Sequence, residues 1–133
     1  MACGLGHFIG LDTHDVGGYP RGVQRIDEPG IRALRTTRVL AQGMVLTVEP
    51  GIYFNDYQID KGLANPAQAP FLNETRLDGL RNFGGCRIED VVLVTATGIE
   101  QFTTVPRDIA RVEAICQGGV FDPSTGLVGP PPS

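Results

Sequence analysis

Three side chains that lie far apart in the sequence could act together on a divalent metal ion. His7 supplies an imidazole, whereas Glu49 and Glu89 supply carboxylates, and each lies in or beside an apolar stretch typical of a β-strand. An imidazole with carboxylates and no thiolate suits a first-row ion of moderate hardness, manganese more readily than structural zinc. Carboxylates can also bridge two ions, and a two-metal centre activates water and polarises a carbonyl group. These residue types therefore indicate hydrolytic chemistry.

Both histidines of the chain, His7 and His14, lie in the glycine-rich segment 4–15. Glycine lets the backbone approach another backbone or a ligand closely, so the segment predicts a bent strand or a loop rather than a helix. A single histidine on an apolar face is usually a core residue with its hydrogen bonds satisfied. Two histidines flanked by Asp12 and Asp15 make a metal or catalytic site an equal alternative.

The segment Val45–Phe54 is an apolar run with one carboxylate, Glu49, directly before Pro50. A strand here would place Thr47 and Glu49 on one face and the neighbouring apolar residues on the other. Because Pro-Gly suits the centre of a type II turn, Glu49 is expected at a sharp strand end. A carboxylate in apolar surroundings needs a partner. Two interpretations remain open: a salt bridge to an upstream arginine, Arg35 or Arg38, or a metal or catalytic role.

The second carboxylate, Glu89, lies in a predicted β-hairpin. Residues 86–95 and 99–103 read as two strands with a glycine-containing turn between them. The first strand is apolar on both faces apart from Arg87, Glu89 and Asp90, which is the pattern of a strand covered on both sides.

The other segments predict few regular elements. Residues 55–73 read as a polar surface excursion, and the stretches expected to be helical are 64–72, 74–82 and 108–116. Residues 31–40 carry arginines at every third position and fit either a helix with a cationic stripe or a strand. Residues 118–133 are rich in glycine and proline and poor in apolar residues, so we expect a disordered tail there.

The composition limits the class of protein. The 133 residues have the length of one domain, and a net charge of −4 without a basic run disfavours nucleic acid or an anionic membrane as a partner. Neither a membrane span nor an export leader is recognisable, so a cytoplasmic protein is the expectation. Three widely spaced cysteines predict no disulfide, and Cys86 and Cys116 are expected to be buried.

The sequence around these residues is more specific than their spacing. Six segments occur in one order: Gly4–Gly10, His14–Pro20, Arg25–Gly30, Leu34–Thr36, Gly43–Phe54 and Arg87–Asp90. Together they closely resemble the C-terminal catalytic region of the Xaa-Pro dipeptidases, or prolidases, over residues 1 to about 117. The resemblance implies an α+β fold, the C-terminal portion of the pita-bread fold of creatinase-type aminopeptidases. It consists of a curved antiparallel sheet with few helices, forming a partial catalytic domain over residues 1–117 that lacks the N-terminal half of the fold.

The resemblance also assigns roles to individual residues. His7, Glu49 and Glu89 would be three of five side chains that hold two manganese ions in the complete enzyme. Glu89 would bridge the ions, and Glu49 would also shuttle the proton of the attacking water. His14 and Arg35 match positions that contact the substrate, and Arg35 would clamp the carboxylate of a C-terminal proline or hydroxyproline, for which a planar guanidinium is suited.

The sequence also departs from this family. Family members supply the other two ligands, both aspartates, and a further histidine from a hairpin N-terminal to this region, and they have histidine at the position of Cys3. We therefore expect a C-terminal fragment that is inactive alone and belongs to an enzyme that is commonly a homodimer. The alternatives are an exopeptidase like aminopeptidase P, acting on longer peptides, and a non-catalytic binding module on the same fold. Arg35 favours the dipeptidase, because a carboxylate clamp beside the second residue rejects longer chains.

Overall fold

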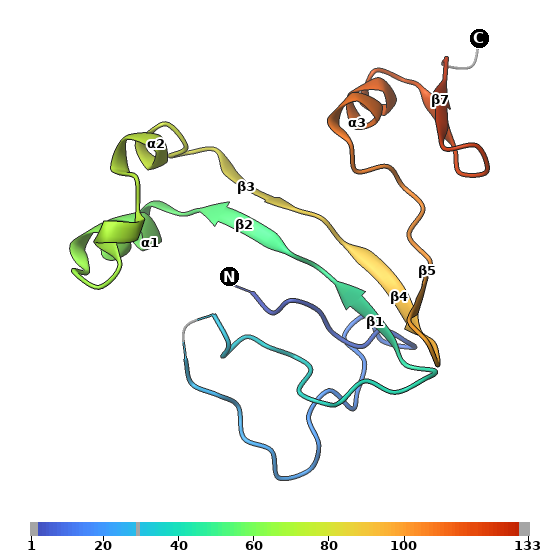
Figure 1. Ribbon diagram of the computed structural model, residues 1–133, viewed down its shortest axis with the longest axis horizontal. Helices are drawn as coiled ribbons and strands as arrows, with labels where there is room; N and C mark the ends of the chain where they lie inside the picture. The colour runs from blue at the N-terminus through green and yellow to red at the C-terminus, as the bar shows by residue number, and fades with distance from the viewer. Residues whose placement is uncertain (1–2, 29, 131–133) are drawn as a thin grey trace.

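The computed structural model describes residues 3–28 and 30–130, and its centre is a long two-stranded ribbon (Figure 1). One side of the ribbon consists of β1 (Val45–Val48) followed by β2 (Gly51–Phe54). The other side consists of β3 (Gly84–Arg87) followed by β4 (Asp90–Val94). β1 pairs with β4 and β2 pairs with β3, both antiparallel. The ribbon thus brings together the two segments that carry the glutamates.

The two halves of the ribbon keep one register across the gap between them. Partners such as Val48 with Asp90 and Gly51 with Arg87 have residue numbers that add to 138 in both ladders. Continued through the gap, this register sets Glu49 opposite Glu89. The amide of Ile88 also donates to the carbonyl of Pro50, at 3.1 Å.

The strand end expected at Glu49 is confirmed, because β1 ends at Val48. The expected type II turn is wrong. Gly51 is not among the glycines with positive φ, and the chain continues as β2 along the same ribbon (Figure 1). Pro50 interrupts one ladder without reversing the chain, because the carbonyl of a proline can still accept a hydrogen bond although its nitrogen donates none.

The predicted hairpin is confirmed for β4 and β5 (Ile99–Gln101), which pair antiparallel. The single strand expected over 86–95 is wrong, because it is divided into β3 and β4, and Glu89 lies between them. On the opposite edge of β1 runs the segment 5–9, which is joined by the bond from the Thr47 amide to the His7 carbonyl, at 2.8 Å, and by an isolated bridge between Phe8 and Leu46. β1 therefore lies between β4 and the N-terminal segment, with both edges occupied.

One face of this small sheet carries the core. Phe8, Leu46 and Val92 are buried together, and the half-buried Met44 and Val94 pack against them. Thr47 and Glu49 lie on the other face, as the alternation of a strand requires. The ribbon thus separates an apolar face from a polar one, and the polar face holds the site residues.

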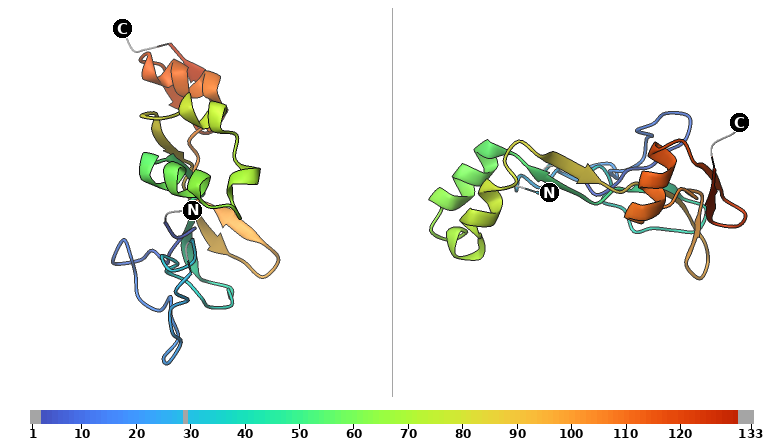
Figure 2. Two further views of the ribbon diagram at one scale, coloured as in Figure 1. Left: turned by 90° about the vertical axis from the view of Figure 1, so that its left-hand side faces the viewer. Right: turned by 90° about the horizontal axis from the view of Figure 1, so that it is seen from above.

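The helices lie at the two ends of the molecule (Figure 2). At one end are α1 (Asp56–Ala64), the 3₁₀ turn η1 (Ala69–Phe71) and α2 (Glu74–Asp78). α2 confirms the helix expected within 74–82, whereas the helical piece expected over 64–72 is only the turn η1. α1 itself was read as irregular, although Asn55 caps it by accepting from the amide of Gln58.

One arginine ties these helices together. The guanidinium of Arg81 lies 2.6 Å from Asp60, 2.9 Å from Asp78 and 3.3 Å from Asp56. Hydrogen bonds to Asp78 and Asp60 raise the pKa of Arg81 above its ordinary value. α1 and α2 therefore form one unit at the end of the ribbon.

The other end consists of α3 (Ile109–Cys116), where the sequence predicts a helix, and of a hairpin formed by β6 (Val120–Asp122) and β7 (Leu127–Gly129). β7 contacts α3. The structure therefore differs from the expected disordered tail over 118–130, because β6 and β7 pair there. Residues 131–133 lie outside the described residues, and the limits of the domain over 1–117 remain a prediction.

Between residues 10 and 43 the described chain has neither helix nor strand, so both alternatives for 31–40 are wrong. Cys3, Cys86 and Cys116 are free, as expected, but all three are exposed, which contradicts the expected burial of Cys86 and Cys116. None of the helices in the described ranges is long and apolar enough to cross a membrane.

Candidate metal centre

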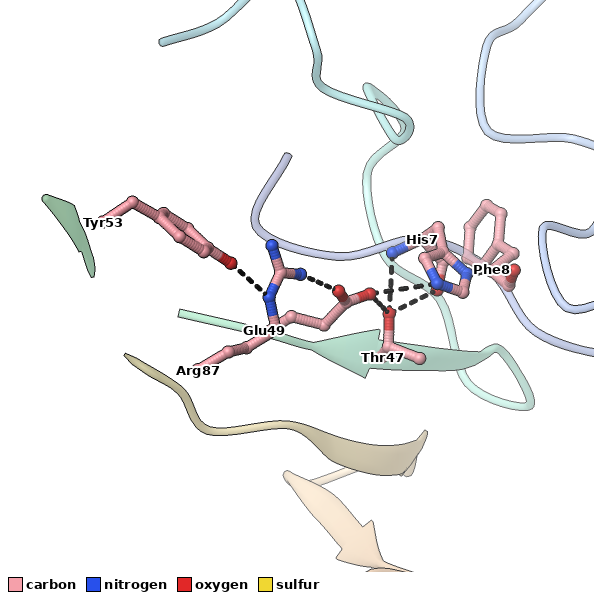
Figure 3. A network of polar contacts seen from close by, with 6 residues as sticks. All are labelled: His7, Phe8, Thr47, Glu49, Tyr53 and Arg87. Carbon is pink, nitrogen blue, oxygen red and sulfur yellow. Dashed lines mark hydrogen bonds and ion pairs between the residues drawn. The ribbon is translucent and has the colours of Figure 1, made fainter. Parts of the chain in front are cut away.

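His7 is buried and fixed through three of its atoms (Figure 3). Its amide donates to the hydroxyl of Thr47 at 3.0 Å, and its Nδ1 lies 2.9 Å from the carbonyl oxygen of Phe8. A proton on Nδ1 that is donated to this carbonyl leaves the lone pair of Nε2 free, which is the arrangement of metal-binding histidines. Nε2 lies 3.0 Å from Oε1 of Glu49.

Glu49 is the buried carboxylate of the site. Its Oε1 accepts a hydrogen bond from the Thr47 hydroxyl at 2.5 Å, and its Oε2 accepts one from Nη1 of Arg87. The sequence left open a salt bridge from Glu49 to Arg35 or Arg38. Glu49 does form a salt bridge, but its partner is Arg87, so the predicted partner is wrong. Each carboxylate oxygen has a donor, so burial of the charge is compensated.

Arg87 is held on its other side by Tyr53. The arginine Nε donates to the tyrosine hydroxyl at 2.7 Å, and the guanidinium lies 5.7 Å from the centre of the ring. The hydrogen bond to Tyr53 and the charge of Glu49 raise the pKa of Arg87. Tyr53, Arg87 and Glu49 form a chain of contacts along the ribbon, which fixes the carboxylate plane of Glu49 (Figure 3).

Glu89 completes a cluster of possible ligands. One ligand atom from each of His7, Glu49 and Glu89 lies within 4.8 Å of the other two, and Glu89 is the exposed member. Nε2 of His7 with its lone pair and Oε1 of Glu49 would face each other as two acceptors, an arrangement that a cation between them resolves. The donor set therefore fits a divalent ion, and the structure brings together the three residues that the sequence singled out.

The two residues predicted to contact substrate lie beside this cluster. A cavity of about 210 Å³ is lined by Cys3, Gly4, Gly6, His7, His14, Arg35, Glu49 and Arg87. The rings of His7 and His14 meet edge to face, with their centres 4.5 Å apart. A second hollow of about 580 Å³, open to solvent, is lined by residues of the segments 101–111 and 121–126 and contains none of the predicted site residues.

Sequence reasoning missed the residues that support the cluster. Thr47, with 1% of its surface exposed, contacts both His7 and Glu49, while Arg87 and Tyr53 orient the carboxylate from the other side. The signal for Thr47 was present in its position two residues before Glu49, on the same strand face. The position of Arg87 depends on the pairing of β2 with β3, which the sequence did not predict.

Comparison with known proteins supports a metal centre in this chain. Residues 1–96 match metallopeptidase family M24, and the chain therefore belongs to that family. It has the C-terminal portion of the pita-bread fold, as expected. Membership of a metallopeptidase family implies dependence on a divalent metal ion.

Among curated proteins the chain is similar to the Xaa-Pro dipeptidase of Homo sapiens, with 58% identity over 130 residues, and to that of Mus musculus, with 62% identity over 129 residues. These matches cover 98% and 97% of this chain but only 26% of each relative. The chain thus spans about a quarter of the length of these relatives. A probable Xaa-Pro aminopeptidase of Uncinocarpus reesii is 43% identical over 117 residues, which is 88% of this chain and 24% of that protein.

Among solved structures, the aminopeptidase PepP of Pseudomonas aeruginosa matches with a TM-score of 0.51 and 34% identity. The match covers 85% of this chain and 20% of that one.

Proposed function

We propose that this chain is the C-terminal catalytic part of an Xaa-Pro dipeptidase, which hydrolyses dipeptides ending in proline or hydroxyproline. The observation that carries this proposal is the cluster of His7, Glu49 and Glu89 within 4.8 Å, of which His7 and Glu49 line a cavity together with Arg35. High identity to the human and mouse Xaa-Pro dipeptidases over nearly the whole chain supports the choice of substrate.

His7, Glu49 and Glu89 would hold the metal, and we propose manganese as the native ion. The imidazole and carboxylate donors are of the kind that manganese accepts. When bound, two such ions polarise the scissile carbonyl and make water more nucleophilic. Three side chains are too few for a dinuclear site, and we propose that two further carboxylates come from outside the chain.

The remaining chemistry belongs to side chains of the cavity. Glu49 would take the proton of the attacking water and return it to the leaving proline nitrogen, while Arg87 keeps its carboxylate in place. His14, beside His7, would contact the substrate near the peptide bond. Arg35 would bind the carboxylate of the second residue, which selects dipeptides over longer chains.

Aminopeptidase P-like activity is the second candidate, and the Uncinocarpus reesii relative favours it. The presence of Arg35 on the cavity favours the dipeptidase, since an aminopeptidase must leave that end open to a continuing chain. A non-catalytic binding module would not need the cluster of His7, Glu49 and Glu89.

We further propose that the complete enzyme is a cytoplasmic homodimer, with no nucleic acid or membrane as its partner.

The test combines the purified chain with manganese and glycyl-proline. Calorimetry should detect at most one weakly bound manganese ion, and no proline should be released. Adding the part of the mouse Xaa-Pro dipeptidase that the match does not cover gives what we call the assembled protein, which should release proline. Glu89→Gln should abolish this release, and the matched control Glu100→Gln, on an exposed position of β5, should not.

Two results would contradict the proposal. Turnover by the chain alone that is lost on Glu89→Gln would mean that Asp12, Asp15 or Asp90 supplies the further ligands. An assembled protein that binds manganese but leaves glycyl-proline intact would overturn the assigned substrate.

A further inference from the structure

The irregular segment 18–25 contacts the irregular segment that contains Arg35, through polar side chains that donate to a backbone carbonyl oxygen. The hydroxyl of Tyr19 donates to the carbonyl oxygen of Leu34 at 2.8 Å, and Nη1 of Arg25 donates to the same oxygen at 2.6 Å. The guanidinium of Arg25 also lies 4.6 Å from the centre of the Tyr19 ring. One carbonyl oxygen thus receives two donors whose side chains stack on each other.

The contact continues on the other side of Arg35. The amide of Thr37 donates to the carbonyl of Gly18 at 2.9 Å. A Cβ atom placed on Gly18 would lie 1.9 Å from the carbonyl oxygen of Arg35, so the two backbones touch there. The peptide group that precedes Arg35 and the one that precedes Thr37 are therefore both hydrogen-bonded to the segment 18–25.

Arg35 differs from the neighbouring arginines in its side chain. Arg32 lies 3.6 Å from Asp27, and Arg38 donates to the Gly17 carbonyl at 3.4 Å. Within the described part of the chain, the guanidinium of Arg35 makes neither a hydrogen bond nor an ion pair, and Arg35 is one of the residues that line the cavity. Its backbone is fixed while its charged end is available to a ligand.

We propose that Tyr19 and Arg25 are positioning residues for substrate specificity. By holding the Leu34 carbonyl they orient the peptide that leads into Arg35, and so they set where its guanidinium meets the carboxylate of the substrate. A planar bidentate contact is sensitive to such placement. The stack on Tyr19 keeps Arg25 at the carbonyl, so the two residues act as one support. This inference rests on the proposed function through the role of Arg35.

The experiment uses Tyr19→Phe, which removes one hydroxyl and keeps the ring, and Arg25→Met, which removes the cation and keeps an apolar stem. Tyr57→Phe on α1 and Arg76→Met on α2 repeat the same chemical changes at exposed positions away from the cavity. In the assembled protein, KM and kcat are measured for glycyl-proline and for glycyl-prolinamide, which has no carboxylate. In the chain itself, ¹⁵N relaxation of the Arg35 Nε–H group reports the order of that side chain.

Tyr19→Phe should raise the KM of glycyl-proline about threefold to tenfold, in line with the loss of one neutral hydrogen bond, and leave kcat within about twofold. The amide should be unaffected, and Arg35 should become more mobile. Arg25→Met should have the larger effect on both readouts, and Arg25→Lys, which keeps a cationic donor, a smaller one. The controls should change neither.

Unchanged KM and unchanged Arg35 mobility in both variants would overturn the inference. Equal losses for the dipeptide and the amide would assign Tyr19 and Arg25 a general structural role and would also overturn it. If the unsubstituted protein does not distinguish the acid from the amide, the proposed function fails. The relaxation measurement then decides by itself whether the pair positions Arg35.

Discussion

The cavity has two walls that are built in different ways. The ligand wall consists of residues 5–9 and of the ribbon around Glu49 and Glu89, directly after β1 and before β4, where the neighbouring backbone ladders fix every second residue on one face. The loop wall consists of residues 12–28 and 30–38, which form no helix or strand and are held by isolated bonds, several of them from side chains to carbonyl oxygens. The ligand wall carries the candidate metal ligands, and the loop wall carries the candidate substrate contacts.

This difference matches what each wall has to do. Ligands of a metal ion must keep their positions to a fraction of an ångström, and a ladder shared with a buried core provides that rigidity. A substrate contact has to admit and release its ligand, so a segment held by a few polar bonds is sufficient. A single substitution should therefore disturb the ligand wall globally and the loop wall locally.

The largest effect is expected from Gly6→Ala. A Cβ atom at Gly6 would lie 2.0 Å from the carbonyl oxygen of Thr47, so the N-terminal segment would be pushed off β1. We expect a loss of about 3 kcal/mol in unfolding free energy, the upper range for overpacking, together with loss of manganese binding by the assembled protein. Urea denaturation and calorimetry measure the two effects.

Two further alanines serve as comparisons for Gly6→Ala. In the loop wall, a Cβ atom at Gly18 would lie 1.9 Å from the carbonyl oxygen of Arg35. Gly18→Ala should nevertheless reduce the stability less than Gly6→Ala, because that segment can shift. Gly98→Ala, where a Cβ meets nothing within 4 Å, should be close to neutral. Equal destabilisation by Gly6→Ala and Gly18→Ala would remove the contrast between the walls.

The second effect concerns Thr47→Val. It removes the hydroxyl that donates to Glu49 and leaves the buried amide of His7 without its acceptor. An unsatisfied buried group costs about 1 to 3 kcal/mol, and loss of a residue supporting metal ligands typically lowers metal affinity about tenfold or more. Thr47→Ser keeps the hydroxyl and should retain most of the unfolding free energy and most of the metal affinity. If Thr47→Val changes neither the metal affinity measured by calorimetry nor the unfolding free energy, the hydroxyl does not hold the ligands.

The contrast between the walls also explains what the sequence could predict. The alternation of Val45–Glu49, the hairpin of β4 and β5 and the helix over 109–116 depend on local patterns, and the structure has them. The cluster of His7, Glu49 and Glu89 was indicated by residue types beside strand segments and made specific by the motifs that resemble the dipeptidase family. The partner of Glu49 was not found, since Arg87 reaches it only through the pairing of β2 with β3.

Other misses have the same physical origin. The conformation of 31–40 depends on Tyr19 and Arg25, which are remote in sequence, and no local periodicity encodes such contacts. The hairpin of β6 and β7 forms in a segment of poor composition because β7 contacts α3. The exposure of Cys86 follows from its place in β3, which has only β2 beside it.

The third prediction concerns Arg35→Ala in the loop wall. A hydrogen bond to a charged group contributes about 1.5 to 3 kcal/mol, so glycyl-proline should be used at least tenfold less efficiently by the assembled protein. Prolinamide substrates, which lack the carboxylate, should be affected much less, and the unfolding free energy should hardly change. The measurement is kcat/KM for the acid and the amide. Equal losses for the two substrates would leave Arg35 with a structural role only.

The smallest effect is expected at a second loop held by side-chain bonds, the turn between β6 and β7. Asp122 accepts from the hydroxyl of Ser124 at 2.6 Å, from its amide at 2.8 Å and from the hydroxyl of Thr125 at 3.0 Å. The bonds from Ser124 are the main reason why the pKa of Asp122 is lowered. A carboxylate whose pKa is lower in the folded state stabilises that state above its unfolded pKa, and the contribution is lost as the pH falls through the folded pKa. The turn should therefore be unchanged from pH 8 to 5 and loosen only below the ordinary aspartate value of about 3.9.

Asp122→Asn should remove this acid transition in the amide shift of Ser124, while Asp108→Asn, at the cap of α3, should leave it in place. Loosening of the turn at neutral pH would show that the side-chain bonds of Asp122 do not hold it.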